Sequence, residues 1–131
     1  MKIVVLDAFV ENPGDLDWDW LSAFGEFEIF ERTSLTDEAQ IIERIGQAEV
    51  AITNKTPITA SIMKACPNLK LVSVLATGYN IIDVDYATQN DVTVCNVPAY
   101  STNSTSQFAI ALLLEMTNNV GLHNASVHAG D

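Results

Sequence analysis

Residues 69–116 read LKLVSVLATGYNIIDVDYATQNDVTVCNVPAYSTNSTSQFAIALLLEM, and this stretch decides the predicted fold. The apolar run at residues 71–76 is too short for a core helix and predicts a buried parallel strand. A turn at residues 77–80 follows. Its Gly78 has no Cβ, which lets the backbone bend sharply and the N–H approach a ligand closely. Ligands bind at such strand ends in open α/β sheets, although a tight strand–helix turn alone would also explain the glycine.

The second half of the stretch predicts another strand and a long helix. Residues 92–97 form an apolar strand that stops at Pro98. Thr102 to Ser104 supply cap residues for an apolar helix over about residues 104–118. Beyond Thr117 the Asn, Gly and His residues predict a frayed end.

The rest of the chain repeats the alternation of strand and helix. Helical segments are expected from Asp15 or Asp17, from Thr36 and from Thr59, between strands near residues 2–6, 27–31, 49–53, 70–75 and 92–96. This order predicts an α/β fold with right-handed crossovers. We therefore expect a flavodoxin-like, doubly wound, five-stranded parallel sheet with a long C-terminal helix.

Composition restricts the partners. The chain has 131 residues and a formal net charge of −11, which argues against binding to nucleic acid or to an anionic membrane. Apolar runs stay below the roughly 18 residues of a membrane helix, and Met1-Lys2 leads directly into a strand, so we expect a cytoplasmic protein. Cys66 and Cys95 lie far apart without metal-ligand spacing, which predicts free thiols and no metal site.

Four motifs together resemble the D-isomer-specific 2-hydroxyacid dehydrogenases. They are TGYNIID at 77–83, VTVCNVP at 92–98, YST at 100–102 and STSQ at 104–107. Their order and spacing match the signature of the family's substrate domain. The departure is Thr105-Ser106, where Val-Ala is usual. Asn54-Lys55 and Gln107 are similar to the glycerate dehydrogenase and hydroxypyruvate reductase branch.

The resemblance implies an NAD(P)-dependent oxidoreductase that interconverts a small D-2-hydroxy acid, similar to glycerate, and its 2-oxo acid, similar to hydroxypyruvate. Residues 1–101 would be the substrate-binding domain, and 102–131 an interdomain helix and tail leading to an absent dinucleotide-binding domain. The family's Gly-rich cofactor motif and its catalytic His, Glu and Arg have no counterpart here, and His123 and His128 read as surface residues. We therefore expect no catalytic residue in this fragment, no bound NAD or NADP, and no turnover by the fragment alone.

The candidate substrate-binding residues follow two strands that end at the same edge of the sheet. Lys55 carries a compact charge suited to a carboxylate, although a solvated loop lysine is the simpler reading. The resemblance implies that backbone amides after the fourth strand hold the substrate carboxylate, as an anion-binding concavity can. The full set is Asn54, Lys55, Thr77, Gly78 and Tyr79.

The long helix has two expected roles. The resemblance implies that its first turns face the nicotinamide through Tyr100, Thr102, Thr105 and Gln107. The residues Leu112–Leu114 and Met116 are expected at a core or interface, and we expect a homodimer through this helix. Asn80 and Asp83 are expected to cap the short helix that follows them.

Two alternatives stay open from the sequence. One is a non-enzymatic flavodoxin-like module such as a phosphoacceptor receiver domain, because Asp7 ends the first strand. That chemistry needs a carboxylate after the third strand and a lysine after the fifth, where this chain has Thr53-Asn54 and Val97-Pro98. The other is a regulatory or scaffold fragment that only dimerises through its apolar helix.

Overall fold

The computed structural model describes residues 1–12 and 14–130. The chain divides into two compact units, Met1–Pro98 and Ala99–Asp131.

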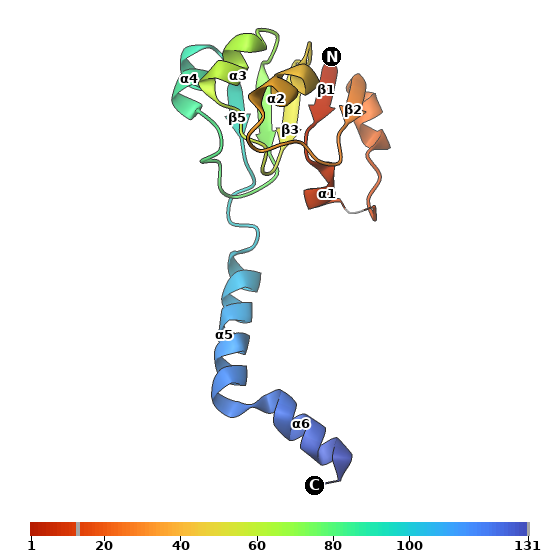
Figure 1. Cartoon of the computed structure of the whole chain (residues 1–131), viewed down its shortest axis with the longest axis vertical. Coiled ribbons are helices and arrows are strands. Elements are labelled where there is room, and N and C mark those ends of the chain that lie inside the picture. The colour runs from red at the N-terminus through yellow and green to blue at the C-terminus, as the bar shows by residue number, and fades with distance from the viewer. Residues whose placement is uncertain (13, 131) are drawn as a thin grey trace. The chain divides into compact units, whose positions relative to one another are not determined.

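The first unit is built on one sheet of five parallel strands in the order β2-β1-β3-β4-β5 (Figure 1). The strands are β1 (Lys2–Val5), β2 (Glu26–Ile29), β3 (Val50–Thr53), β4 (Leu71–Val74) and β5 (Thr93–Cys95). This order is that of flavodoxin-like folds and confirms the predicted sheet. Each strand lies within two residues of its predicted bounds at either end.

Five short helical segments connect the strands: α1 (Ala8–Glu11), the 3₁₀ helix η1 (Asp19–Ala23), α2 (Glu38–Ile45), α3 (Ala60–Ala65) and α4 (Val84–Gln89). Side chains cap three of them, because Asp37, Thr59 and Asp83 accept a hydrogen bond from the third following backbone N–H.

Three expectations about helix starts are wrong. The helix expected from Asp15 or Asp17 is only the 3₁₀ helix η1. The cap of α2 is Asp37, one residue after Thr36. Asp83 alone caps α4, because Asn80 lies three residues before the N-cap position.

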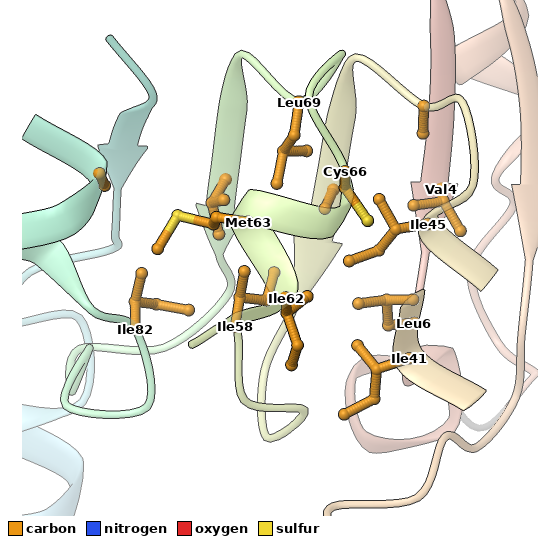
Figure 2. Packing of buried hydrophobic residues seen from close by; sticks show 14 of the residues in the cluster. Val4, Leu6, Ile41, Ile45, Ile58, Ile62, Met63, Cys66, Leu69 and Ile82 are labelled. Atoms are coloured by element: carbon orange, nitrogen blue, oxygen red, sulfur yellow. The ribbon is translucent and has the colours of Figure 1, made fainter. Parts of the chain in front are cut away.

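The neighbouring strands β1 and β3 are buried on both faces of the sheet, which explains their nearly continuous apolar sequences. Val4 and Leu6 point to the face covered by α2, α3 and α4, where they join Ile45, Ile62 and other residues (Figures 1 and 2). Ile3 and Val5 point to the opposite face, where they pack with Leu21 of η1. Each fully buried side chain of this size contributes roughly 1.5–3 kcal/mol.

The second unit consists of two helices, α5 (Thr102–Asn118) and α6 (Val120–Ala129). The long helix α5 confirms the prediction. The expected frayed end is wrong, because α6 follows after a single left-handed residue, Asn119, with φ 48°. Thr102 does not cap α5 as expected, since it lies inside the helix, and the N-cap residue Ser101 makes no side-chain capping bond.

Neither helix of the second unit contains a buried residue. His123 and His128 lie in α6 and are exposed. Across the described residues, no helix combines the length and apolar character that a membrane crossing requires.

Leu69→Ala should lower the free energy of unfolding by about 2–5 kcal/mol, because Leu69 is 4% exposed and its loss leaves a cavity in the core under α3. The matched control is Leu35→Ala, which removes the same atoms from a side chain that is 55% exposed and should stay within about 0.5 kcal/mol. Urea unfolding followed by circular dichroism measures both. Equal losses for the two variants would contradict this assignment of the core.

Candidate functional site

The carboxyl ends of β1, β3 and β4 meet at one edge of the sheet, because these three strands are parallel neighbours. Asp7 follows β1, residues 54–56 follow β3, and residues 75–79 follow β4. Most of the residues predicted from the sequence therefore lie at one edge, where ligands bind in open α/β sheets.

Asp7 is the centre of the hydrogen bonding at this edge. Its carboxylate is 4% exposed and accepts from three consecutive backbone N–H groups: Asn54 to Oδ1 at 2.8 Å, and Lys55 and Thr56 to Oδ2 at 2.6 and 2.9 Å. The hydroxyls of Thr53 and Thr56 lie 3.3 and 3.2 Å from Oδ2. Both oxygens are thus engaged by the turn after β3.

Asn54 joins this turn to the end of the next strand. Its side chain is buried, and Nδ2 donates to the backbone carbonyl of Leu75 at 3.0 Å. That bond identifies Oδ1 as the acceptor atom, which is buried and accepts no hydrogen bond from the described residues. Asn54 therefore acts inside the edge as a link between two strand ends.

Lys55 points outward between the buried residues Asn54 and Thr56. In residues 1–12 and 14–130, the ion pairs within 4 Å are those of Glu49 with Lys70 and with the N-terminus. The exposed ammonium of Lys55 is thus not paired with a carboxylate of the described chain. An unpaired lysine on an ordered turn is suited to bind a small anion.

The turn after β4 presents the backbone groups of Thr77, Gly78 and Tyr79, which are all exposed. It is anchored to the segment after β5, because Thr77 Oγ1 donates to the Val97 carbonyl at 3.0 Å and Asn96 Nδ2 donates to the Thr77 carbonyl at 2.7 Å. Within the described chain, the N–H groups of Gly78 and Tyr79 donate no hydrogen bond. Two such amides on an anchored turn can serve an anion.

The expectation that the turn needs glycine at position 78 in order to bend sharply is wrong. Its φ is not in the left-handed region, unlike that of Gly14, Gly25, Gly46 and Gly130. A Cβ at Gly78 would meet Asn80 Oδ1 at 3.5 Å, an ordinary contact. The turn itself therefore does not require glycine, and the remaining advantage is an unobstructed approach to the backbone N–H.

Two hollows lie next to this edge. One of about 300 Å³ is bounded by the end of β4 and by the segment after β1, and its lining is Glu11, Asn12, Leu16, Asp17, Trp18, Trp20 and Leu75. A second, of about 240 Å³, is lined by Tyr79, Val84, Val94, Cys95 and Asn96. Tyr79 is 52% exposed and forms part of this second wall.

The sequence prediction missed two residues at this edge. Asp7 was considered only as one acidic residue of a receiver-type site, and Glu11 was not considered at all. Burial raises the pKa of Glu11, the nearby Asp7 carboxylate raises it further, and the Lys55 ammonium partly opposes both effects. A signal for Asp7 did exist, since an acid directly after a fully apolar strand must find donors when it is buried.

The four residues predicted to face a cofactor belong to the second unit. Tyr100 precedes α5, and Thr102, Thr105 and Gln107 lie in its first turns. Their side chains are exposed. No group of three or more His, Cys, Asp or Glu residues that could hold a metal ion occurs in the described part of the chain.

Comparison with known proteins identifies a family. Residues 4–127 match the model of the catalytic domain of D-isomer specific 2-hydroxyacid dehydrogenases. The chain is 54% identical over 130 residues to a hydroxypyruvate reductase of Blautia hydrogenotrophica, covering 99% of this chain and 40% of that protein. It is 33% identical over 106 residues to a glycerate dehydrogenase of Methylorubrum extorquens, covering 81% of this chain and 33% of that protein. The chain thus spans well under half the length of these relatives.

Solved structures agree on the fold. An acyclic imino acid reductase in complex with NADPH and D-Arg matches with a TM-score of 0.78 and 27% identity, over 100% of this chain and 42% of that one. A D-2-hydroxyisocaproate dehydrogenase matches with a TM-score of 0.72 and 24% identity, over 100% of this chain and 40% of that one.

Glu11→Gln should stabilise the protein at pH 7 and have little effect near pH 3. The raised pKa means that the folded state binds this proton more tightly than the unfolded state, so folding stability falls as pH rises through the pKa of Glu11. Glutamine keeps the side chain neutral and removes that loss of stability. The free energy of unfolding at pH 7 should therefore rise by up to about 0.5 kcal/mol, the scale of a surface substitution. Thermal unfolding at both pH values measures the difference.

The control is Glu43→Gln on the exposed side of α2, which also removes one negative charge from this acidic chain. The gain at pH 7 should be larger for Glu11→Gln than for Glu43→Gln. Identical gains would mean that net charge alone, and not the surroundings of Glu11, sets the effect.

Proposed function

Because the chain belongs to the D-isomer specific 2-hydroxyacid dehydrogenase family, we propose that it is the substrate domain of an NAD- or NADP-dependent oxidoreductase. The enzyme interconverts a small D-2-hydroxy acid and its 2-oxo acid. Hydroxypyruvate and D-glycerate are the proposed pair, supported by the 54% identity to a hydroxypyruvate reductase. In the reducing direction C2 of the 2-oxo acid receives a hydride and its carbonyl oxygen receives a proton.

One observation carries the proposal: an unpaired ammonium and unused backbone amides occupy the same edge of the sheet. Lys55 follows β3, and the amides of Gly78 and Tyr79 follow the neighbouring strand β4. The substrate carboxylate would bind to these donors, with Asn54 and Thr77 holding the two turns in place. These local donors let a chain of net charge −11 bind an acid, because short-range contacts decide the field at the site.

The cofactor assignment concerns the second unit. When bound, the nicotinamide cofactor supplies or accepts the hydride. Tyr100, Thr102, Thr105 and Gln107 would face it, and they fit this role because they are exposed and α5 begins without a side-chain cap on its first N–H groups. Residues 1–101 are proposed as the substrate domain and 102–131 as the interdomain helix and its continuation.

Catalysis requires groups that this stretch of chain does not supply. The family resemblance assigns proton transfer and carbonyl polarisation to a His, a Glu and an Arg outside the four motifs recognised here. We therefore propose that these 131 residues bind substrate in the whole enzyme but do not turn it over alone. The cytoplasmic location stays a prediction.

The surface of α5 supports a homodimer. Phe108, Ile110, Leu112, Leu113, Leu114 and Met116 are each at least 50% exposed. Successive residues of a helix are about 100° apart, so these six side chains spread over about 240° of the circumference of α5, and Gln107, Ala111 and Glu115 occupy the remainder. A helix whose apolar surface is this wide is normally buried in a larger assembly.

The chain should form a dimer or a higher oligomer through α5, and Leu113→Glu should shift it toward monomer by placing a charge in the apolar contact. The control Ser104→Glu changes an exposed polar residue on the opposite side of the same helix and should leave the oligomer intact. Light scattering over a concentration series measures both. A monomer at every concentration would contradict the proposed dimer.

Lys55→Ala in the full-length enzyme should raise KM for hydroxypyruvate about ten- to hundredfold and change kcat much less. The range corresponds to one charge-assisted hydrogen bond of about 1.5–3 kcal/mol. A charge that holds the carboxylate equally in the ground and transition states contributes uniform binding, and its loss appears mainly in KM. Steady-state kinetics with hydroxypyruvate and glyoxylate is the measurement.

Lys64→Ala is the matched control, because Lys64 is an exposed lysine of α3, away from the strand ends. Its KM should equal that of the unmodified enzyme. An unchanged KM for Lys55→Ala with both substrates would remove Lys55 from the binding site.

A further inference from the structure

The turn that carries Lys55 is organised by one buried carboxylate from another strand. Asp7 accepts the N–H groups of Asn54, Lys55 and Thr56, which are 47 to 49 residues away in sequence. Three consecutive N–H groups converge on one carboxylate only in a tightly curved backbone, so Asp7 selects the conformation of this turn. Hydrogen bonds to a charged acceptor are stronger than those between neutral groups.

The same curvature decides where the lysine points. Asn54 and Thr56 are buried on either side of Lys55, and Thr53 Oγ1 lies 3.0 Å from the Thr56 carbonyl, which closes the turn. Lys55 is then the exposed residue at the tip. Its side chain makes no contact with Asp7 that would neutralise the ammonium, because the carboxylate bonds to the backbone N–H groups.

The turn is also connected to the second half of the proposed site. The Asn54 side chain donates to the Leu75 carbonyl, and Leu75 in turn donates its N–H to the Thr53 carbonyl at 2.8 Å. Leu75 lies two residues before Thr77 and the amides that follow it. A change at Asp7 would therefore move Lys55 relative to the Gly78 amide as well as loosen the turn.

We propose that Asp7 is a positioning residue that places the Lys55 ammonium against the substrate carboxylate without touching the substrate. The proposal rests on the proposed function, since it needs Lys55 to bind the substrate. It predicts that Asp7 affects the reaction only through Lys55. A residue that merely supported the fold would act independently of the lysine.

Asp7→Asn is the sharpest test because it keeps the size of the side chain. The amide has one oxygen instead of two, and its NH₂ group donates where backbone N–H groups must be accepted. One part of the turn is then left without an acceptor. In the full-length enzyme, KM for hydroxypyruvate should rise about tenfold, the scale of a weakened charge-assisted hydrogen bond, with kcat nearly unchanged.

The decisive measurement is the same substitution in a Lys55→Ala background. If Asp7 acts through Lys55, Asp7→Asn should add less than about twofold to the KM of that variant, since coupled residues are not additive. An equal tenfold rise in both backgrounds would overturn the positioning role. The positioning role would also be overturned if Asp7→Asn left KM unchanged in the enzyme that retains Lys55.

Two further variants keep the test conclusive. Thr56→Val removes one hydroxyl donor to Asp7 with little change of shape, and it should also raise KM. This variant provides the test if Asp7→Asn does not fold. Asp37→Ala removes another structural carboxylate, the cap of α2, and should lower the melting temperature without changing KM. If Lys55→Ala itself leaves KM unchanged, the proposed substrate site fails. If Lys55→Ala raises KM and neither Asp7→Asn nor Thr56→Val does, only the role of Asp7 fails.

Discussion

The burial of Asp7 beside the turn that follows the central strand β3 is the constraint on which the arrangement of the site depends. β3 pairs with β1 on one side and β4 on the other, so the residues after all three strands share one edge. A carboxylate buried there must find donors. It finds them in the backbone N–H groups of three residues in the turn after β3. The order of the strands brings the carboxylate to this turn, and the hydrogen bonds then set the shape of the turn.

The way this charge is satisfied has an electrostatic consequence. Had the buried carboxylate been paired with the nearby lysine, the chain would have no cation to offer at this edge. Because backbone N–H groups satisfy Asp7, the Lys55 ammonium makes no ion pair within 4 Å in the described chain. An acidic protein can in this way present a positive group at the same edge of the sheet as the amides of Gly78 and Tyr79.

The second unit follows a different principle. The first unit buries its apolar residues on both faces of a sheet, whereas α5 and α6 have none buried. The sequence of α5 contains many residues of high helix propensity, but nothing in the sequence of either helix says what covers it. The relatives are more than twice as long as this chain, and the proposed partners of these helices are a second copy and the dinucleotide-binding domain.

The sequence by itself determined the strands, their parallel order and the family, because apolar periodicity and the spacing of four motifs are local properties of the chain. It also located Asn54, Lys55 and the turn at Gly78 at strand ends, although their role as a site stays a prediction. It did not predict α6, since Gly, Asn and His are weak helix formers and composition alone suggested an end. Only the tertiary structure decided the hydrogen bonding of Asp7, the backbone conformation of Gly78 and the link from Asn54 to Leu75. The physical reason is that these features depend on donors and acceptors from distant strands, which come together only when the sheet forms.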